Sequence, residues 1–136
     1  MIVYFDTSAF VTLFLPDEET TRARLAWDLA PATAVSLVLY AEARSALAAA
    51  RRHGGAVSVA DAGAAIGERL YESHVVTPTY RLVHDAGGLA EVRALRGFDA
   101  VHLASALQTG PETVVVTADK RLAGAALAEG MVVLAV

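Results

Sequence analysis

The chain of 136 residues contains no cysteine, which excludes disulfide bonds and any thiolate chemistry. It also lacks long hydrophobic runs, because none approaches the roughly 20 apolar residues that a membrane-spanning helix needs. The first residues carry no basic segment of the kind that begins a signal peptide. We therefore expect a cytoplasmic protein that makes no use of a membrane.

Positive charge is scarce as well. There are 11 Lys and Arg residues against 15 Asp and Glu residues, which leaves a net charge of −4. This balance argues against a general nucleic-acid-binding protein with a broad basic surface, but not against an enzyme whose acidic residues hold cations. Charged residues make up only 19% of the chain, so part of the surface can stay apolar for a partner. The length predicts a single domain over residues 1–136.

Short apolar segments of strand length alternate with segments of helical character. The pattern predicts strands at residues 2–5, 33–35, 75–77, 113–116 and 132–136. It predicts helices after residue 6 up to Pro16 and at residues 17–30, 36–53, 58–73, 80–95, 99–107 and 119–129. Thr7 or Ser8 is expected to cap the first helix, and Ser58 with Asp61 to begin the fourth. Continuously apolar strands of this kind are typical of a parallel sheet that helices cover on both faces, an α/β fold.

Two acidic residues follow predicted strands directly. Asp6 comes after the first strand, and Asp119 lies three residues after Val116, where the fourth strand is expected to end. Ligands of open parallel sheets bind beyond the carboxyl ends of the strands, so both acids are predicted to face the same edge. Thr117 lies next to this edge and can orient a carboxylate with its hydroxyl.

Two further acids occur on predicted helices in apolar surroundings, Glu42 in LVLYAEARSALA and Asp99 in GFDAVHLASAL. A carboxylate near a core is costly unless a positive group compensates its charge. Four carboxylates without a cysteine ligand favour a hard ion, Mg²⁺ or Mn²⁺. Each acid also has a plain alternative: Asp6, Asp99 and Asp119 as helix caps or turn residues, and Glu42 as a solvated helix residue.

Four segments together resemble a PIN domain, and more narrowly a VapC-type toxin of a bacterial toxin–antitoxin pair. They are DTSAFVTLFLPDE, YAEARSALAAARR, GFDAVHLASAL and VVVTADKRLAGAALAEG. The resemblance implies a three-layer α/β/α fold with five mostly parallel strands in the order 3-2-1-4-5. It also implies a Mg²⁺-dependent endoribonuclease, in which Mn²⁺ can substitute.

Six residues match the motifs of this family. The acidic quartet corresponds to Asp6, Glu42, Asp99 and Asp119, and the supporting hydroxyls to Ser8 and Thr117. The resemblance then implies that the first three acids hold the principal ion, while Asp119 positions the attacking water or a second ion. It further implies an RNA substrate, a small VapB-type antitoxin as partner, and a homodimer.

Other candidate residues carry less specific signals. Seven basic residues are candidates to line an RNA groove: Arg44, Arg51, Arg52, Arg93, Arg96, Lys120 and Arg121. Arg44 and Lys120 are the preferred ones, since they lie beside the motif acids. His102 follows Asp99 by one turn and either supports the site or packs in the core. Four apolar residues either pack in the core or form a groove for an antitoxin segment: Phe10, Leu13, Phe14 and Trp27.

Two rival interpretations remain open at this stage. The first is a receiver-like or phosphatase-like domain that uses Asp6 as a phosphate acceptor, with Thr117 and Lys120 nearby. Ser8 argues against a phosphatase-like domain, which requires a second acidic residue at that position. The second rival is a domain that binds RNA or an antitoxin without cleavage, in which the acids serve as structural caps.

Overall fold

The computed structural model describes residues 1–16 and 21–136 in full and residues 18–20 by their backbone alone. The elements in chain order are β1 (Ile2–Phe5), α1 (Thr7–Thr12), α2 (Glu18–Leu29), β2 (Thr33–Ser36), α3 (Leu39–Arg52), α4 (Ala62–Tyr71), β3 (His74–Val76), α5 (Tyr80–Arg93), α6 (Gly97–Gln108), β4 (Thr113–Thr117), α7 (Lys120–Ala128) and β5 (Val132–Ala135). The predicted start of the second helix, Asp17, lies outside the described residues.

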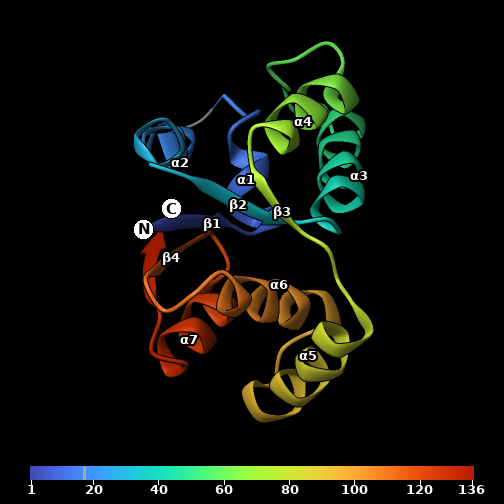
Figure 1. Cartoon of the computed structure of the whole chain (residues 1–136). Helices are drawn as coiled ribbons and strands as arrows, with labels where there is room; N and C mark the ends of the chain where they lie inside the picture. The colour runs from blue at the N-terminus through green and yellow to red at the C-terminus, as the bar shows by residue number, and fades with distance from the viewer. Residues whose placement is uncertain (17) are drawn as a thin grey trace.

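The five strands form one parallel sheet in the order β3-β2-β1-β4-β5, which confirms the predicted topology. Helices α1 to α4 cover one face of the sheet and α5 to α7 cover the other, as Figure 1 shows. The central strand β1 pairs with β2 on one side and with β4 on the other. The carboxyl ends of β1 and β4 therefore lie next to each other, where the strand order reverses.

Each face of the sheet has its own apolar core, since side chains of a strand alternate between faces. Tyr4 packs in the core under α5 to α7, whereas Val3 and Phe5 pack in the core under α1 to α4. The second core also contains the four apolar residues that were predicted either to pack in the core or to form an antitoxin groove: Phe10, Leu13, Phe14 and Trp27. All four are buried, so they are core residues and form no exposed groove.

The ends of two helices differ from the prediction. The carboxyl group of Asp6 accepts a hydrogen bond from the Ala9 amide and so caps α1, in place of Thr7 or Ser8. At α4 the cap is Asp61, and Ser58 instead donates its hydroxyl to the carbonyl of Phe14. Helix caps depend on where the chain turns, and several neighbouring polar residues satisfy the local pattern equally well.

Strand β2 and helix α3 also differ from the prediction at their junction. Ser36 was expected to begin the helix, but it pairs with Val76 of β3 and belongs to the strand. The helix begins three residues later, at Leu39. Helix α5, in contrast, runs unbroken through Gly87 and Gly88, because its contacts with α6 offset the poor helix propensity of glycine. Within the described residues, none of the helices has both the length and the apolar character that crossing a bilayer requires.

Candidate active site

Asp6 lies at the junction of β1 and α1 and is almost completely buried. One carboxylate oxygen, Oδ1, accepts from the Ala9 amide at 2.9 Å, and the other, Oδ2, accepts from the Thr117 hydroxyl at 2.8 Å. The Ser8 hydroxyl donates to the same group, at 2.9 and 2.8 Å from its two oxygens. Burial raises the pKa of Asp6, although these hydrogen bonds and the nearby His102 act in the opposite direction.

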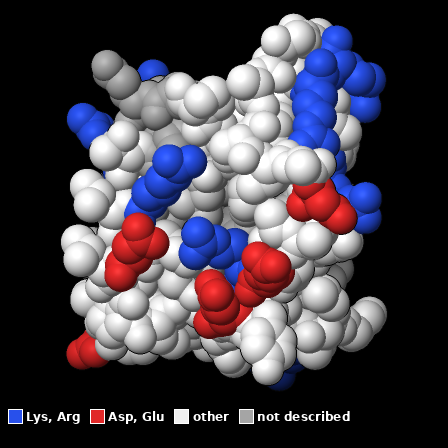
Figure 2. Space-filling model, turned by 90° about the horizontal axis from the view of Figure 1, so that it is seen from above, with Lys and Arg blue, Asp and Glu red and all other residues white. Residues whose placement is uncertain are grey.

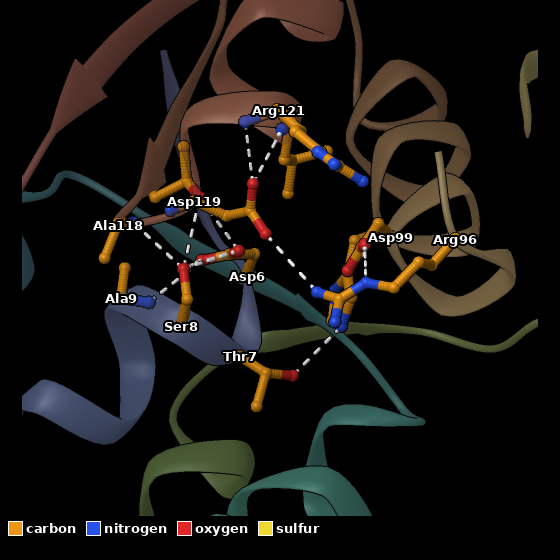
Figure 3. Close-up of polar contacts among 12 residues, drawn as sticks. Asp6, Thr7, Ser8, Ala9, Arg96, Asp99, Ala118, Asp119 and Arg121 are labelled. Carbon is orange, nitrogen blue, oxygen red and sulfur yellow. Dashed lines mark hydrogen bonds and ion pairs between the residues drawn. The ribbon is translucent and has the colours of Figure 1, made fainter. Parts of the chain in front are cut away.

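Ser8 and Thr117 connect Asp6 to the loop after β4. The Ser8 hydroxyl accepts from the Ala118 amide at 2.9 Å, and the Thr117 hydroxyl accepts from the Asp119 amide at 3.0 Å. The two hydroxyl oxygens lie 3.2 Å apart. The predicted supporting hydroxyls thus occupy the space between the first and the fourth acid, and Figure 3 shows this chain of contacts.

Asp119 uses its two carboxylate oxygens differently. Oδ1 caps α7 by accepting from the amides of Arg121 and Leu122, at 2.7 and 3.2 Å. Oδ2 faces the guanidinium of Arg96, with 3.4 Å between Oδ2 and Nη2. The cap interpretation is therefore right for one oxygen, and the other is directed at the site.

Arg96 joins two of the predicted acids. Its Nε donates to Oδ2 of Asp99 at 2.8 Å, while its Nη2 reaches Asp119, as drawn in Figure 3. The hydrogen bond that Arg96 donates to Asp99 is the main reason that the pKa of Arg96 is raised, and the charges of Asp99, Asp119 and Glu42 add to it. The side chain is 73% exposed, so it is a solvated cation held between acids. Asp99 itself lies in the first turn of α6, for which the N-cap is Arg96, so Asp99 is not the helix cap.

Glu42, on α3, is held by two side chains from other elements. The Thr7 hydroxyl donates to its Oε1 at 2.9 Å, and Nε2 of His102 donates to the same oxygen at 2.7 Å. Partial burial on its own would raise the pKa of Glu42, but the hydrogen bonds of His102 and Thr7, together with the charges of His102 and Arg96, lower it. Glu42 is thus not a solvated helix residue.

His102 is buried and connects the site to the core. On its other ring nitrogen, Nδ1 lies 2.9 Å from the Tyr4 hydroxyl, and burial raises the pKa of this tyrosine well above its usual value. Because a carboxylate accepts only, Nε2 carries a proton, and in the neutral ring Nδ1 accepts from Tyr4. Of the two possibilities for His102, the structure favours support of a site acid.

Sequence reasoning missed Thr7 and ranked Arg96 too low. The position of Thr7 between Asp6 and Ser8 was the available signal for the first, and the spacing of three residues between Arg96 and Asp99 on one helix was the signal for the second. Of the preferred basic residues, Arg44 stacks on Tyr40, and Lys120 is exposed directly after Asp119, at the start of α7; their contact with RNA stays a prediction. Figure 2 shows basic and acidic side chains side by side on a largely uncharged face, without a broad basic patch.

The four acids lie at the carboxyl edge of the sheet, but their carboxylates are not arranged as a preformed metal-binding site. In the part of the chain that the structure describes, no three Asp, Glu or His side chains are close enough together to hold a metal ion. The Thr117 hydroxyl bridges the Asp6 carboxylate and the Asp119 amide, and the Arg96 guanidinium bridges the carboxylates of Asp119 and Asp99. The Glu42 carboxylate is hydrogen-bonded to Thr7 and His102. The positive charge among the acids is therefore the guanidinium of Arg96.

Comparison with known proteins decides the family. A family model described as the PIN domain matches residues 3–127 of this chain. The chain belongs to the PIN-domain family. Among characterised PIN-domain relatives, it is 42% identical over 135 residues to "Ribonuclease VapC45" of Mycobacterium tuberculosis, which covers 95% of this chain and 92% of the relative.

Solved structures agree with the PIN-domain fold. The Mycobacterium tuberculosis toxin VapC20, described as cleaving the sarcin-ricin loop, has a TM-score of 0.72 at 23% identity, with 96% of each chain covered. VapBC-1 from nontypeable Haemophilus influenzae has a TM-score of 0.65 at 18% identity, covering 99% of this chain and 98% of the other. At these identities the likeness concerns the fold.

Proposed function

We propose that this PIN domain is a metal-dependent endoribonuclease, the toxin of a type II toxin–antitoxin pair. The observation that carries the proposal is the arrangement of Asp6, Glu42, Asp99 and Asp119 at one edge of the sheet, in a chain 42% identical to a protein named as a ribonuclease. Hydrolysis of RNA phosphodiester bonds is the chemistry that a site rich in carboxylates and free of thiols supports best.

The donor chemistry of the site fits Mg²⁺ or Mn²⁺. The four acids offer carboxylate oxygens, the ligands that these ions prefer, and the negative charge at this edge already holds one cation, the guanidinium of Arg96. We infer that Asp6, Glu42 and Asp99 hold the principal ion. Asp119 helps to position the attacking water or a second ion. A bound divalent ion supplies Lewis-acid chemistry there, lowering the pKa of a water and stabilising charge on phosphate oxygens.

The residues around the acids keep each carboxylate in place. Ser8 and Thr117 fix both oxygens of Asp6, and the α7 amides fix one oxygen of Asp119, while the other faces Arg96. Thr7 and His102 fix Glu42. Since Arg96 is exposed and its two partners are carboxylates, it is free to exchange them for an RNA phosphate once the acids bind an ion.

A small VapB-type antitoxin is the proposed partner, and the cytoplasm is the proposed compartment. A protein of similar fold is described as VapBC-1. The second candidate function is a PIN domain that binds RNA or its antitoxin without cleavage. One observation favours it, namely that no three acidic or histidine side chains among the described residues form a metal cage as the structure stands.

A cleavage assay separates the two functions. The purified protein, free of antitoxin, is incubated with total cellular RNA in Mg²⁺, in Mn²⁺ and in chelator, and the new RNA ends are mapped. We expect cuts at one or a few sites that require the metal, and their loss in Asp6→Asn, which keeps the size of the buried side chain. Cleavage by Asp6→Asn at the parent rate, or cutting that persists in chelator, would exclude the metal mechanism, and no cutting at all would favour the binding domain.

A further inference from the structure

A cavity opens beside Glu42 and Asp99, between α5 and α6. Its volume is about 570 Å³. Its apolar walls come from both helices: Val83, Ala86, Gly87, Ala90, Phe98 and Val101. Its rim carries two of the site acids, Glu42 and Asp99, and Arg96, the cation that contacts Asp99 and Asp119. The cavity is therefore continuous with the proposed cleavage site.

Phe98 is the unusual residue of this cavity. It precedes Asp99 directly on α6, and its side chain is 59% exposed although Val101 and Leu103 of the same helix are buried. Val83 faces the same cavity from α5 and is 48% exposed. An aromatic ring and an aliphatic side chain left open beside charged groups indicate a surface that a ligand covers.

The chemistry of the cavity suits a nucleobase. Proteins that recognise single-stranded RNA stack splayed bases on aromatic side chains and contact the polar base edges with charged or amide groups. Phe98 offers the ring, and the rim offers Arg96 as donor and Asp99 as acceptor. The three charged residues on the rim favour an occupant with polar edges, such as a nucleobase, over an apolar side chain of an antitoxin or of a second copy of this chain, because an apolar side chain would cover these charges without pairing them.

We propose that this cavity binds one unstacked nucleobase of single-stranded RNA, adjacent to the phosphate that the acids process, and that Phe98 is its stacking platform. The proposal rests on the proposed function, because it places the base beside that cleavage site. It makes the cavity a determinant of which nucleotide stands next to the cut.

Two neighbouring glycines on α5 give a matched pair of variants. Gly87 lines the cavity, whereas Gly88 does not, and both are exposed. A Cβ atom added at either position meets nothing within 4 Å, so the backbone tolerates a side chain at both. Gly87→Leu fills the cavity and Gly88→Leu does not, while both changes raise the helix propensity equally.

Variants of Phe98 test the stacking itself. Phe98→Ala removes the platform, and Phe98→Trp keeps an aromatic face. Because Phe98 is largely exposed, both variants are expected to keep the fold, which circular dichroism and thermal unfolding check.

The readout is binding of a single-stranded oligouridine RNA that carries one central 2-aminopurine, with and without Mg²⁺. Stacking of 2-aminopurine on an aromatic ring quenches its fluorescence. We expect quenching with the wild type and with Phe98→Trp, and roughly 5- to 50-fold weaker binding with Phe98→Ala and Gly87→Leu. Gly88→Leu should stay within about twofold of the wild type. In Mg²⁺, the mapped RNA ends should lose their nucleotide preference in Gly87→Leu.

The alternatives give different results. If the wild type shows no quenching in either buffer, or if Gly87→Leu binds RNA as the wild type does, the base pocket is wrong. If Gly87→Leu alters self-association in gel filtration or antitoxin binding and leaves RNA binding intact, the cavity is a protein interface and the proposal is overturned. A failure of the proposed function looks different again, because the wild type then cuts no RNA in Mg²⁺ whatever happens to the quenching.

Discussion

His102 and Glu42 are 60 positions apart in the sequence, yet Nε2 of the histidine lies 2.7 Å from Oε1 of the glutamate. The histidine comes from the buried side of α6 and the glutamate from the start of α3, so this contact joins helices on opposite faces of the sheet. It passes close to the end of the central strand, and it holds Glu42 in place at the site.

Removal of the imidazole tests this positioning role. We expect His102→Asn to lower the free energy of unfolding by about 1–3 kcal/mol, because the buried Tyr4 hydroxyl loses its hydrogen bond with the imidazole. We expect it to weaken Mn²⁺ binding by roughly 10- to 100-fold, since Glu42 keeps only Thr7. Denaturant unfolding and a Mn²⁺ titration followed by electron paramagnetic resonance measure the two effects. Tyr4→Phe is the control, with a loss of stability but a smaller change in Mn²⁺ affinity; unchanged affinity in His102→Asn would leave the histidine a purely structural role.

Arg96 should compete with a metal ion for Asp99 and Asp119. Arg96→Ala is expected to raise Mn²⁺ affinity roughly 2- to 5-fold, which corresponds to the free energy of a solvent-exposed ion pair. The free energy of unfolding should hardly change. RNA binding should weaken at the same time, because a cation beside the phosphate is lost. Arg52→Ala, which removes an exposed charge at the end of α3, serves as the control. Weaker Mn²⁺ binding in Arg96→Ala would show that the guanidinium supports the ion instead of excluding it.

Buried Asp6 and partly buried Glu42 should respond to pH with opposite signs in metal-free buffer. The folded-state pKa of Asp6 is raised above its ordinary 3.8, so its contribution to stability is complete below that pH and is lost as the pH rises through the folded value. The folded-state pKa of Glu42 is lowered from its ordinary 4.5, so its contribution is present above that pH and is lost as the pH falls through the folded value.

Unfolding free energies measured from about pH 2 to pH 7 check these signs. With increasing pH the wild type should lose stability relative to Asp6→Asn and gain stability relative to Glu42→Gln. Equal slopes for the two variants would contradict the environments found for these carboxyl groups.

Trp27 is a core residue by its packing, and its replacement should show this directly. Its ring centroid lies 5.0 Å from that of Phe5 and 5.7 Å from that of Phe10. Trp27→Ala is expected to cost about 3–5 kcal/mol of unfolding free energy. Leu25→Ala, on the exposed side of the same helix, should change it by less than about 0.5 kcal/mol. A small effect of Trp27→Ala on stability, with a large effect on antitoxin binding, would restore the groove interpretation.

Much of the fold follows from local pattern. The apolar strands at residues 2–5 and 113–116 were predictable because a strand buried on both faces needs no polar side chain. Helix starts were less predictable, as Ser36 and Ser58 show, because their roles depend on pairing with β3 and on a contact with Phe14. These partners are distant in the sequence, and the residues next to Ser36 and Ser58 do not indicate them.

By itself, the sequence determined the alternation of strands and helices and the presence of acids directly after β1 and β4, since burial and chain direction are local properties of each segment. Only the tertiary structure decided that Arg96 stands between Asp99 and Asp119, that His102 holds Glu42, and that Phe98 lines a cavity beside them. The reason is physical: each of these relationships depends on how α5 and α6 pack on the sheet and on each other. Packing of that kind is set by the sum of many contacts between distant segments.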